Sequence, residues 1–240
     1  MARPDLRRND EMRKLKITPE FTMHAEGSVL VEMGNTKVIC TASVEPNVPP
    51  FLKGTGEGWV TAEYSMLPRA TTTRNKRDIQ KLKLSPRSAE IQRLIGRSLR
   101  AVTDLKAFGE KSIVVDCDVI QADGGTRCAS ITGGYVALYL AFKKLKDRGE
   151  IEKNPLKSQV AAVSAGVFEG DPILDLCYQE DSNADVDFNV VMTGEGEIVE
   201  VQGTGEHRAF TKDELVKMLS LCKKGNAKLV REQNKLTGEF

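Results

Sequence analysis

Two short stretches of the 240-residue chain hold residue types suited to phosphate and metal chemistry. The first, QADGGTRCASITGG (121–134), joins a strand-like run to an apolar, helix-forming run. Gly124 and Gly125 let backbone N–H groups approach a ligand, because no Cβ is in the way. A helix start binds anions through its unpaired N–H groups, and Thr126 and Arg127 add a hydroxyl and a planar guanidinium. We predict a phosphate-binding turn here, although it lacks the lysine and spacing of a P-loop.

A structural role for the same turn is the alternative. Arg127 would then neutralise a nearby carboxylate in a glycine-rich turn that binds no ligand, and the candidate partners are Asp116, Asp118 and Asp123. This segment alone leaves both interpretations open.

The second stretch, EDSNADVD (180–187), brings Asp181, Asp185 and Asp187 within seven residues. If the segment continues as a strand, Asp185, Asp187 and Asn189 share one face. The other face would suit a core, with Val186, Phe188, Val190 and Met192. Carboxylates held close together are costly without a cation, and hard oxygen ligands favour Mg²⁺ or Mn²⁺. The alternative is an exposed, aspartate-rich turn that enters an edge strand.

Charge is distributed unevenly along the chain, although the net charge is only +1. Residues 169–206 hold 11 acidic and no basic residues, whereas residues 69–111 hold 12 Lys/Arg and 4 Asp/Glu. Such asymmetry is typical of a molecule with one polyanion-binding face and one metal-binding face, or of two solvated faces that compensate each other.

Several function classes are disfavoured. The five cysteines are widely spaced without a CxxC pair, so neither a zinc site nor a disulfide framework is indicated, and a reduced, cytoplasmic protein is expected. His24 and His207 lie far apart and no nucleophile motif accompanies them, which argues against a histidine-based triad. The polar amino-terminal segment indicates no secretory signal, and no apolar run approaches the ~18 residues of a membrane helix.

The order of predicted elements indicates an α+β fold. Strands are expected at 27–33, 36–44, 58–67, 112–120, 159–168, 172–178, 185–193 and 197–203. Helices are expected from Ser85-Pro86, over about 131–147, and from Thr211, where Thr and Glu214 form a capping box. The polar segment 69–83, called the basic loop below, is predicted to be a surface loop. Short connections favour mixed or antiparallel sheets with helices packed against them, in one domain (1–240) with two related halves.

Taken together, the motifs resemble those of the ribonuclease PH family. The likeness rests on these stretches: RPDLRRNDEMR (3–13), GWVTAEYSMLPRATTTRNKR (58–77), SPRSAEIQRLIGRSLRA (85–101), ADGGTRCASITGG (122–134) and CYQEDSNADVDFNVVMTGEGEIVEVQGTGE (177–206). They cover nearly the whole chain. The resemblance implies a ribosomal-protein-S5-domain-2-like fold and a phosphorolytic 3′→5′ exoribonuclease. Such a tRNA nucleotidyltransferase uses inorganic phosphate to trim tRNA precursors, and other RNAs such as rRNA, and releases nucleoside diphosphates reversibly.

The resemblance also assigns roles to residues. It implies that phosphate is bound by Arg87, Gly125, Thr126 and Arg127. It implies that Asp181 and Asp187 are catalytic and associated with Mg²⁺, or with Mn²⁺. Contact with the tRNA backbone is implied for Arg69, Arg74 and Arg77. The implied assembly is a hexameric ring built as a trimer of dimers.

Two departures from the family pattern stand out. Cys128 takes a position where a hydroxyl residue, usually Thr, is expected, and GEHRAF (205–210) replaces a more usual small or acidic run. Neither touches Arg127 or the two aspartates, so an active enzyme is expected. The alternatives are a catalytically silent, RNA-binding ring subunit and a metal-dependent nuclease that hydrolyses RNA without phosphate.

Overall fold

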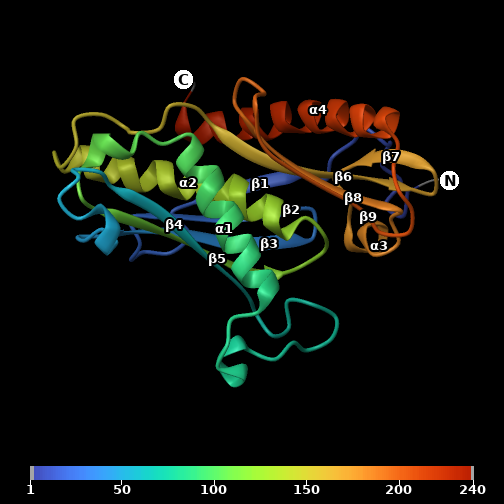
Figure 1. Ribbon diagram of the computed structural model, residues 1–240, viewed down its shortest axis with the longest axis horizontal. Helices are drawn as coiled ribbons and strands as arrows, with labels where there is room; N and C mark the ends of the chain where they lie inside the picture. The colour runs from blue at the N-terminus through green and yellow to red at the C-terminus, as the bar shows by residue number, and fades with distance from the viewer. Residues whose placement is uncertain (1–2, 239–240) are drawn as a thin grey trace.

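The computed structural model describes residues 3–238, which form two β-sheets with helices packed against them (Figure 1). The first sheet has the spatial order β1 (Leu15–Pro19), β2 (Gly27–Met33), β3 (Thr36–Glu45), β5 (Ser112–Gln121) and β4 (Trp59–Met66). Only β4 and β5 run parallel in it. The second sheet is antiparallel, in the order β7 (Asp171–Leu174), β6 (Val160–Phe168), β8 (Val186–Thr193) and β9 (Ile198–Gly205). The predicted α+β class with mixed sheets is confirmed.

Four α-helices accompany the sheets in the described part of the chain. They are α1 (Pro86–Ala101), α2 (Thr126–Asp147), α3 (Tyr178–Asp181) and α4 (Lys212–Thr237). Three short 3₁₀ helices are η1 (Pro50–Leu52), η2 (Asp78–Lys81) and η3 (Leu105–Phe108). Helix α1 packs on β4, and α4 packs on β6 and crosses the top of the molecule in Figure 1. Within residues 3–238, none of the helices has the length and apolar character needed to cross a bilayer.

Helix α2 occupies the centre of the molecule. It contacts β2, β3 and β5 of the first sheet, β6 of the second, and both α1 and α4. Most of its side chains are therefore buried, including Tyr135, Leu138 and Phe142. Residues 128–138 are all buried and so need no polar face, whereas the carboxyl end of the helix exposes Lys143, Lys146 and Asp147. Because both sheets pack against α2, its amino end lies where the two halves meet.

The alternation predicted for β8 is confirmed. Val186, Phe188, Val190 and Met192 are buried in one cluster with Met218, Cys222 and Leu229 of α4. The opposite face of β8 carries the half-buried Asp187 and Asn189. The period-2 pattern of the strand thus places the core on one side and polar side chains on the other.

The main differences from the sequence expectations concern β1, the start of α2 and the end of β7. Strand β1 was not predicted, α2 begins at Thr126 rather than near residue 131, and β7 ends at Leu174. The predicted strand 172–178 ends early because Asp175 has a positive φ of 54° and turns the chain. Its buried carboxylate is held by the side chain of Arg13, a contact between residues 162 positions apart that local sequence cannot reveal.

Candidate active site

The glycine turn, residues 123–127, links the end of β5 to the first residues of α2. Gly124 and Gly125 have φ values of 75° and 66°, in the left-handed region that favours glycine. A Cβ on Gly124 would lie 2.5 Å from the carbonyl oxygen of Leu176, so space as well as conformation requires glycine there. Gly125 precedes the first residue of α2, whose first-turn N–H groups have no partner within the helix. The turn therefore presents backbone donors at the positive end of a helix dipole.

Thr126 is held by a tyrosine that the sequence did not single out. The hydroxyl of Tyr64 and Thr126 Oγ1 share a hydrogen bond of 2.8 Å. Tyr64 lies on β4, next to β5 in the sheet, and burial raises its pKa. The strand at 58–67 was predicted, but nothing in the local sequence pairs Tyr64 with Thr126. Parallel pairing of β4 with β5 makes that contact.

Arg127 points from α2 toward the second sheet. Its Nη1 donates to Gln202 Oε1 of β9 over 2.8 Å and lies 3.4 Å from Glu90 Oε1 of α1. Its side chain is 16% exposed, so it is largely buried but reachable by a ligand. The suggested partners Asp116, Asp118 and Asp123 are not the ones found: Arg127 pairs with the carboxylate of Glu90 and with the amide of Gln202.

Arg87 comes from the first turn of α1. The predicted helix start is confirmed: Ser85 is the N-cap and its Oγ accepts from the Ser88 N–H over 3.1 Å, with Pro86 following it. Arg87 is exposed and lines a cavity of about 480 Å³. The other lining residues are Tyr64, Ser65, Met66, Asn75, Lys76, Arg77, Asp78, Ser85 and Ser88. The cavity thus joins an implied phosphate ligand, Arg87, to an implied RNA contact, Arg77.

The two aspartates come from different elements of the second half. Asp181 ends the short helix α3, and Asp187 lies on β8, paired with Gly166 of β6. Asn189 Nδ2 donates to Asp187 Oδ1 over 3.0 Å, which orients that carboxylate. Asp185 lies just before β8 and its Oδ2 is 3.3 Å from Arg208 Nε, so it belongs to a surface ion pair instead.

Burial and neighbouring negative charges raise the pKa of both carboxylates: Asp187 acts on Asp181, and Glu206 acts on Asp187. The pKa of Asp181 is raised by burial and by the charge of Asp187, while Arg87, Arg127 and Arg13 oppose the rise. The pKa of Asp187 is also raised by burial, and Arg127 and the Asn189 hydrogen bond oppose that rise. The charges of Arg87 and Arg127 thus oppose the rise in pKa of both aspartates. The structure therefore brings the glycine turn and the aspartate motif together in one site.

The site fits a hard divalent cation, although two carboxylates alone would not enclose one. Among the described residues no three His, Cys, Asp or Glu side chains form a cluster able to hold a metal. Mg²⁺, however, is often held by one or two carboxylates, with water and substrate phosphate completing its shell. The charge of Asp187 contributes, after burial, to the raised pKa of Asp181, and a bound cation would relieve that repulsion.

The basic loop extends away from both sheets beside the start of α1 (Figure 1). Arg69, Arg74 and Arg77 are all exposed on it. Its root is fixed, because Ala70 is buried and its carbonyl oxygen accepts from the Ala122 N–H over 2.8 Å. The loop therefore starts beside the glycine turn and carries its arginines outward into solvent.

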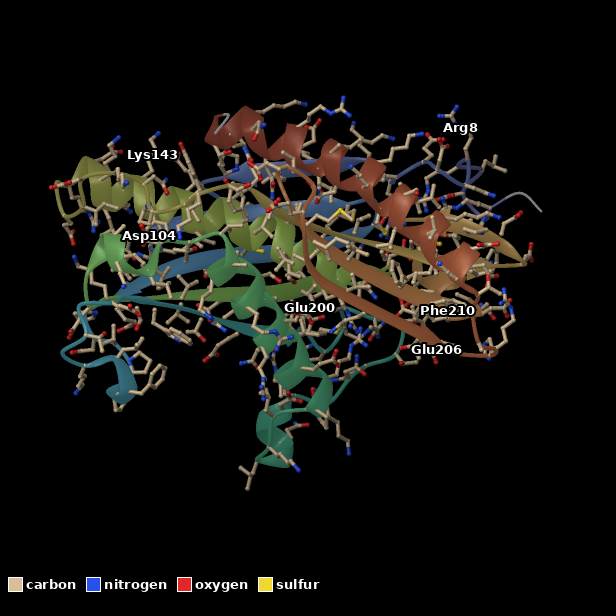
Figure 2. All side chains as sticks on the ribbon, turned by 45° about the horizontal axis from the view of Figure 1, so that its top comes forward. Arg8, Asp104, Lys143, Glu200, Glu206 and Phe210 are labelled. Carbon is tan, nitrogen blue, oxygen red and sulfur yellow. The ribbon has the colours of Figure 1, made fainter. Side chains whose placement is uncertain are left out.

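The two sequence departures lie in different surroundings. Cys128 is 1% exposed and its Sγ donates to Asn189 Oδ1 over 3.3 Å, so it contacts the residue that orients Asp187. Arg208 belongs to the 205–210 departure and pairs with Glu214 of α4 over 2.6 Å. Glu206 and Phe210 lie beside the second sheet in Figure 2; Phe210 packs on the core cluster of that sheet, and the charge of Glu206 contributes to the raised pKa of Asp187.

Sequence reasoning missed three residues that support the site: Arg13, Tyr64 and Gln202. Asn189 was expected on the same strand face as Asp187, and the structure places it there. The RPDLRRNDEMR stretch was recognised, but no role was assigned to its arginines. Each of the three reaches the site from a separate strand or segment, so no spacing along the chain marks them.

Comparisons with known proteins find relatives over nearly the whole chain. Residues 11–144 match the family model of the 3′ exoribonuclease family, domain 1, and residues 158–225 match domain 2 of that family. Ribonuclease PH of Syntrophomonas wolfei subsp. wolfei is 57% identical over 238 residues, which are 99% of this chain and all of that protein. Ribonuclease PH of Dehalococcoides mccartyi is 57% identical over 237 residues, covering 99% of this chain and 98% of that protein.

Solved structures share the fold at lower identity. An Archaeoglobus fulgidus exosome with RNA bound to the active site matches with a TM-score of 0.82 and 22% identity, over 96% of this chain and 92% of that one. Rice Rrp46 matches with a TM-score of 0.79 and 17% identity, over 97% and 98% of the two chains.

Proposed function

The chain belongs to the ribonuclease PH family of 3′ exoribonucleases, and we propose that it trims the 3′ ends of tRNA precursors by phosphorolysis. The observation that carries this proposal is the meeting of Arg127 and the glycine turn with Asp181 and Asp187. The charges of Arg87 and Arg127 act to lower the pKa of both aspartates. One side of the site is suited to an attacking phosphate, and the other to the phosphodiester that is cleaved.

Phosphate is the co-substrate in this reaction. Gly125 N–H, the Thr126 hydroxyl, Arg127 and Arg87 bind it in the proposed arrangement. A phosphate oxygen attacks the last phosphodiester of the RNA and forms a new P–O bond. The bond to the 3′ oxygen of the preceding nucleotide breaks, and that oxygen gains a proton. The products are a nucleoside diphosphate and an RNA shorter by one nucleotide. Because the bonds exchanged are alike, the reverse reaction also runs.

Charge compensation is the main contribution of the protein. Two anions must meet, so Arg127 and Arg87 reduce repulsion on the side of the nucleophile. Asp181 and Asp187 would hold Mg²⁺, or Mn²⁺ in its place. When bound, that ion would stabilise the charge on the reacting oxygens. The raised pKa of each aspartate also supports the alternative that one of them delivers the proton to the leaving oxygen.

The basic loop would hold the RNA rather than react with it. Arg69, Arg74 and Arg77 are exposed, and the loop root lies next to the glycine turn. Their proposed role is contact with the RNA backbone, upstream of the 3′ nucleotide. The substrate class is the 3′ end of tRNA precursors, and other RNAs such as rRNA are included in the proposal.

Assembly, domain organisation and compartment form part of the proposal. The site uses residues from both sheets and α2 packs against both, which supports a single catalytic domain over 1–240. By its family likeness the chain forms a hexameric ring, a trimer of dimers, and native mass spectrometry would test this directly. The five buried, free cysteines fit the reducing cytoplasm, where tRNA precursors are processed.

Product identity tests the reaction. A tRNA precursor with extra 3′ nucleotides is incubated with the protein and Mg²⁺, with and without inorganic phosphate. Nucleoside diphosphates that form only with phosphate support the proposal. Nucleoside monophosphates formed regardless of phosphate would establish a hydrolytic nuclease. Bound but intact RNA in both samples would indicate a silent ring subunit.

A further inference from the structure

Arg13 is a buried arginine that lies directly beneath the glycine turn. Its Nη1 donates to the carbonyl oxygen of Asp123, and its Nη1 and Nη2 each lie 3.5 Å from the carbonyl oxygen of Gly124. The same guanidinium pairs with Asp175, with Nη2–Oδ1 at 2.6 Å and Nε–Oδ2 at 3.0 Å. The side chains of Arg13 and Asp175 are only 5% and 1% exposed.

Thr36 holds the same turn from the β3 side. Its hydroxyl donates to the Gly124 carbonyl oxygen over 2.7 Å and accepts from the Asp123 N–H over 2.9 Å. The Asp123 carboxylate in turn accepts from the N–H of Tyr178, the first residue of α3, over 3.2 Å. The glycine turn is therefore fixed to the short helix that ends in Asp181.

The same amino-terminal segment also fixes α3 directly. Arg3 forms two hydrogen bonds with the buried Glu180, Nε–Oε1 at 2.6 Å and Nη2–Oε2 at 2.8 Å. Arg7 donates to the carbonyl oxygen of Asp175 over 3.0 Å. Glu180 immediately precedes Asp181. Segment 3–13 thus contacts both halves of the site, the turn through Arg13 and the aspartate-bearing helix through Arg3.

The orientation of the carbonyls determines where the N–H groups of the turn point. In a trans peptide the C=O of one residue and the N–H of the next point in opposite directions. Because Arg13 and Thr36 hold the Asp123 and Gly124 carbonyls, the N–H groups of Gly124 and Gly125 are directed the opposite way. Gly125 is the residue whose N–H is proposed to bind phosphate. Glycines have wide conformational freedom, so the turn needs an external constraint to keep this orientation.

The stability of the fold does not by itself explain the buried pair of Arg13 and Asp175. Desolvating two charges can cost more than their attraction returns, and apolar replacements of buried ion pairs are often neutral or stabilising. A buried pair can instead fix one conformation among several. Only an arginine fork can meet the Asp175 carboxylate and the turn carbonyls together.

We propose that Arg13 is a positioning residue for inorganic phosphate, which acts by holding the Asp123 and Gly124 carbonyls so that the glycine turn presents its N–H donors to the ligand. This inference rests on the proposed function. Arg13 does not touch the reacting atoms in this role, and its effect passes through the backbone of the turn.

The variant Arg13→Lys tests the proposal. Lysine keeps the charge beside Asp175 but lacks the planar fork that reaches the turn carbonyls. Small misplacements of a bound reactant cost up to about 10²-fold, so we expect the phosphate KM to rise about tenfold or more. The KM for RNA is expected to stay within about twofold. In the reverse direction the KM for the nucleoside diphosphate should rise in parallel, because its terminal phosphate uses the same turn.

Two further variants separate positioning from folding. Thr36→Val removes the hydroxyl that holds the same carbonyl without disturbing a charge, and it should also raise the phosphate KM. Arg8→Ala is the matched control, because Arg8 belongs to the same segment but its side chain is 78% exposed and lies at the periphery in Figure 2. Its phosphate KM should equal that of the wild type. Circular dichroism and melting temperatures are measured for all three.

The results distinguish a positioning role of Arg13 from a purely structural one. A lower melting temperature of Arg13→Lys with an unchanged phosphate KM would overturn the proposal and leave Arg13 a purely structural residue. If Arg13→Lys does not fold, Thr36→Val provides the test: an unchanged phosphate KM would overturn the proposal. Calorimetric titration with inorganic phosphate alone is run in parallel. A wild type that releases no nucleoside diphosphate refutes the proposed function, and the phosphate affinities of wild type and variants then still test the positioning role.

Discussion

Arg127 and the arginines of the basic loop carry the same charge in opposite surroundings. Arg127 is 16% exposed, is held by Gln202, and acts on two half-buried carboxylates. Arg69, Arg74 and Arg77 are exposed on a segment that extends away from both sheets (Figure 1). In a buried site an electrostatic interaction is stronger than in water, and its partners are already oriented. The difference teaches that position, rather than residue type, distinguishes the arginine proposed to bind phosphate from those proposed to bind RNA.

Replacing Arg127 should have the largest effect. We expect Arg127→Ala to lower kcat/KM by about 10²–10³-fold, the cost typical of losing one preorganised donor to a transition state. Arg127→Lys should recover part of this loss, because it restores the charge but not the planar fork. Steady-state kinetics with saturating RNA and varied phosphate measure both. A loss below about threefold for Arg127→Ala would remove the contrast with the loop.

Replacing the half-buried Asp181 should separate activity from stability. We expect Asp181→Asn to reduce kcat by about 10²-fold, because a charge at the reacting centre is lost. In buffer with a chelator the same variant should melt at a higher temperature than the wild type at pH 7. Activity and melting temperature would be measured on the same preparation, and a variant that loses both would contradict the expectation.

The sign of the stability effect follows from the pKa of Asp181. Burial and Asp187 raise this pKa in the folded state, so ionisation costs more in the folded than in the unfolded protein. That cost grows as the pH rises from the ordinary carboxyl pKa to the raised one, and is complete above it. The gain of Asp181→Asn should therefore be present at pH 7 and vanish in acid. Mg²⁺ should reduce the gain, because it would stabilise the ionised wild type.

Loop arginines should affect binding and its salt dependence instead. We expect Arg74→Ala to raise the KM for RNA a few-fold, with kcat unchanged. Each lost phosphate contact should flatten the plot of log affinity against log salt by about 0.7, the value for a single strand. Filter binding at several salt concentrations measures this slope. An equal fall of kcat at saturating RNA would instead assign the loop a part in the chemistry.

The smallest effect is expected at Cys128. The residue is buried against Asn189, and threonine has similar size and a hydroxyl that can donate to the same oxygen. Cys128→Thr should keep kcat/KM within about threefold, the ordinary scatter for a conservative, well-packed change. A larger loss would show that the orientation of Asp187 depends on the thiol.

The contrast between Arg127 and the basic loop could be predicted in part from the sequence. The glycine pair before a helix and the aspartates on an alternating strand are local patterns, and each indicated its own ligand. The capping residues Ser85 and Thr211 likewise marked helix starts, which the structure confirms. The boundary of α2 was misplaced because residues 126–130 (Thr-Arg-Cys-Ala-Ser) show no apolar helical period, and their helical state follows from packing between the two sheets.

The sequence by itself determined the chemistry available to this protein, because residue type and short-range spacing set charge, donor groups and backbone freedom. Only the tertiary structure decided which groups meet. Arg13, Asp123 and Asp175 come from three distant segments, and Arg127 finds Gln202 on another sheet. Such contacts depend on strand order and on the packing of α2 between the sheets. No spacing along the chain encodes them, because they arise where the two halves fold together.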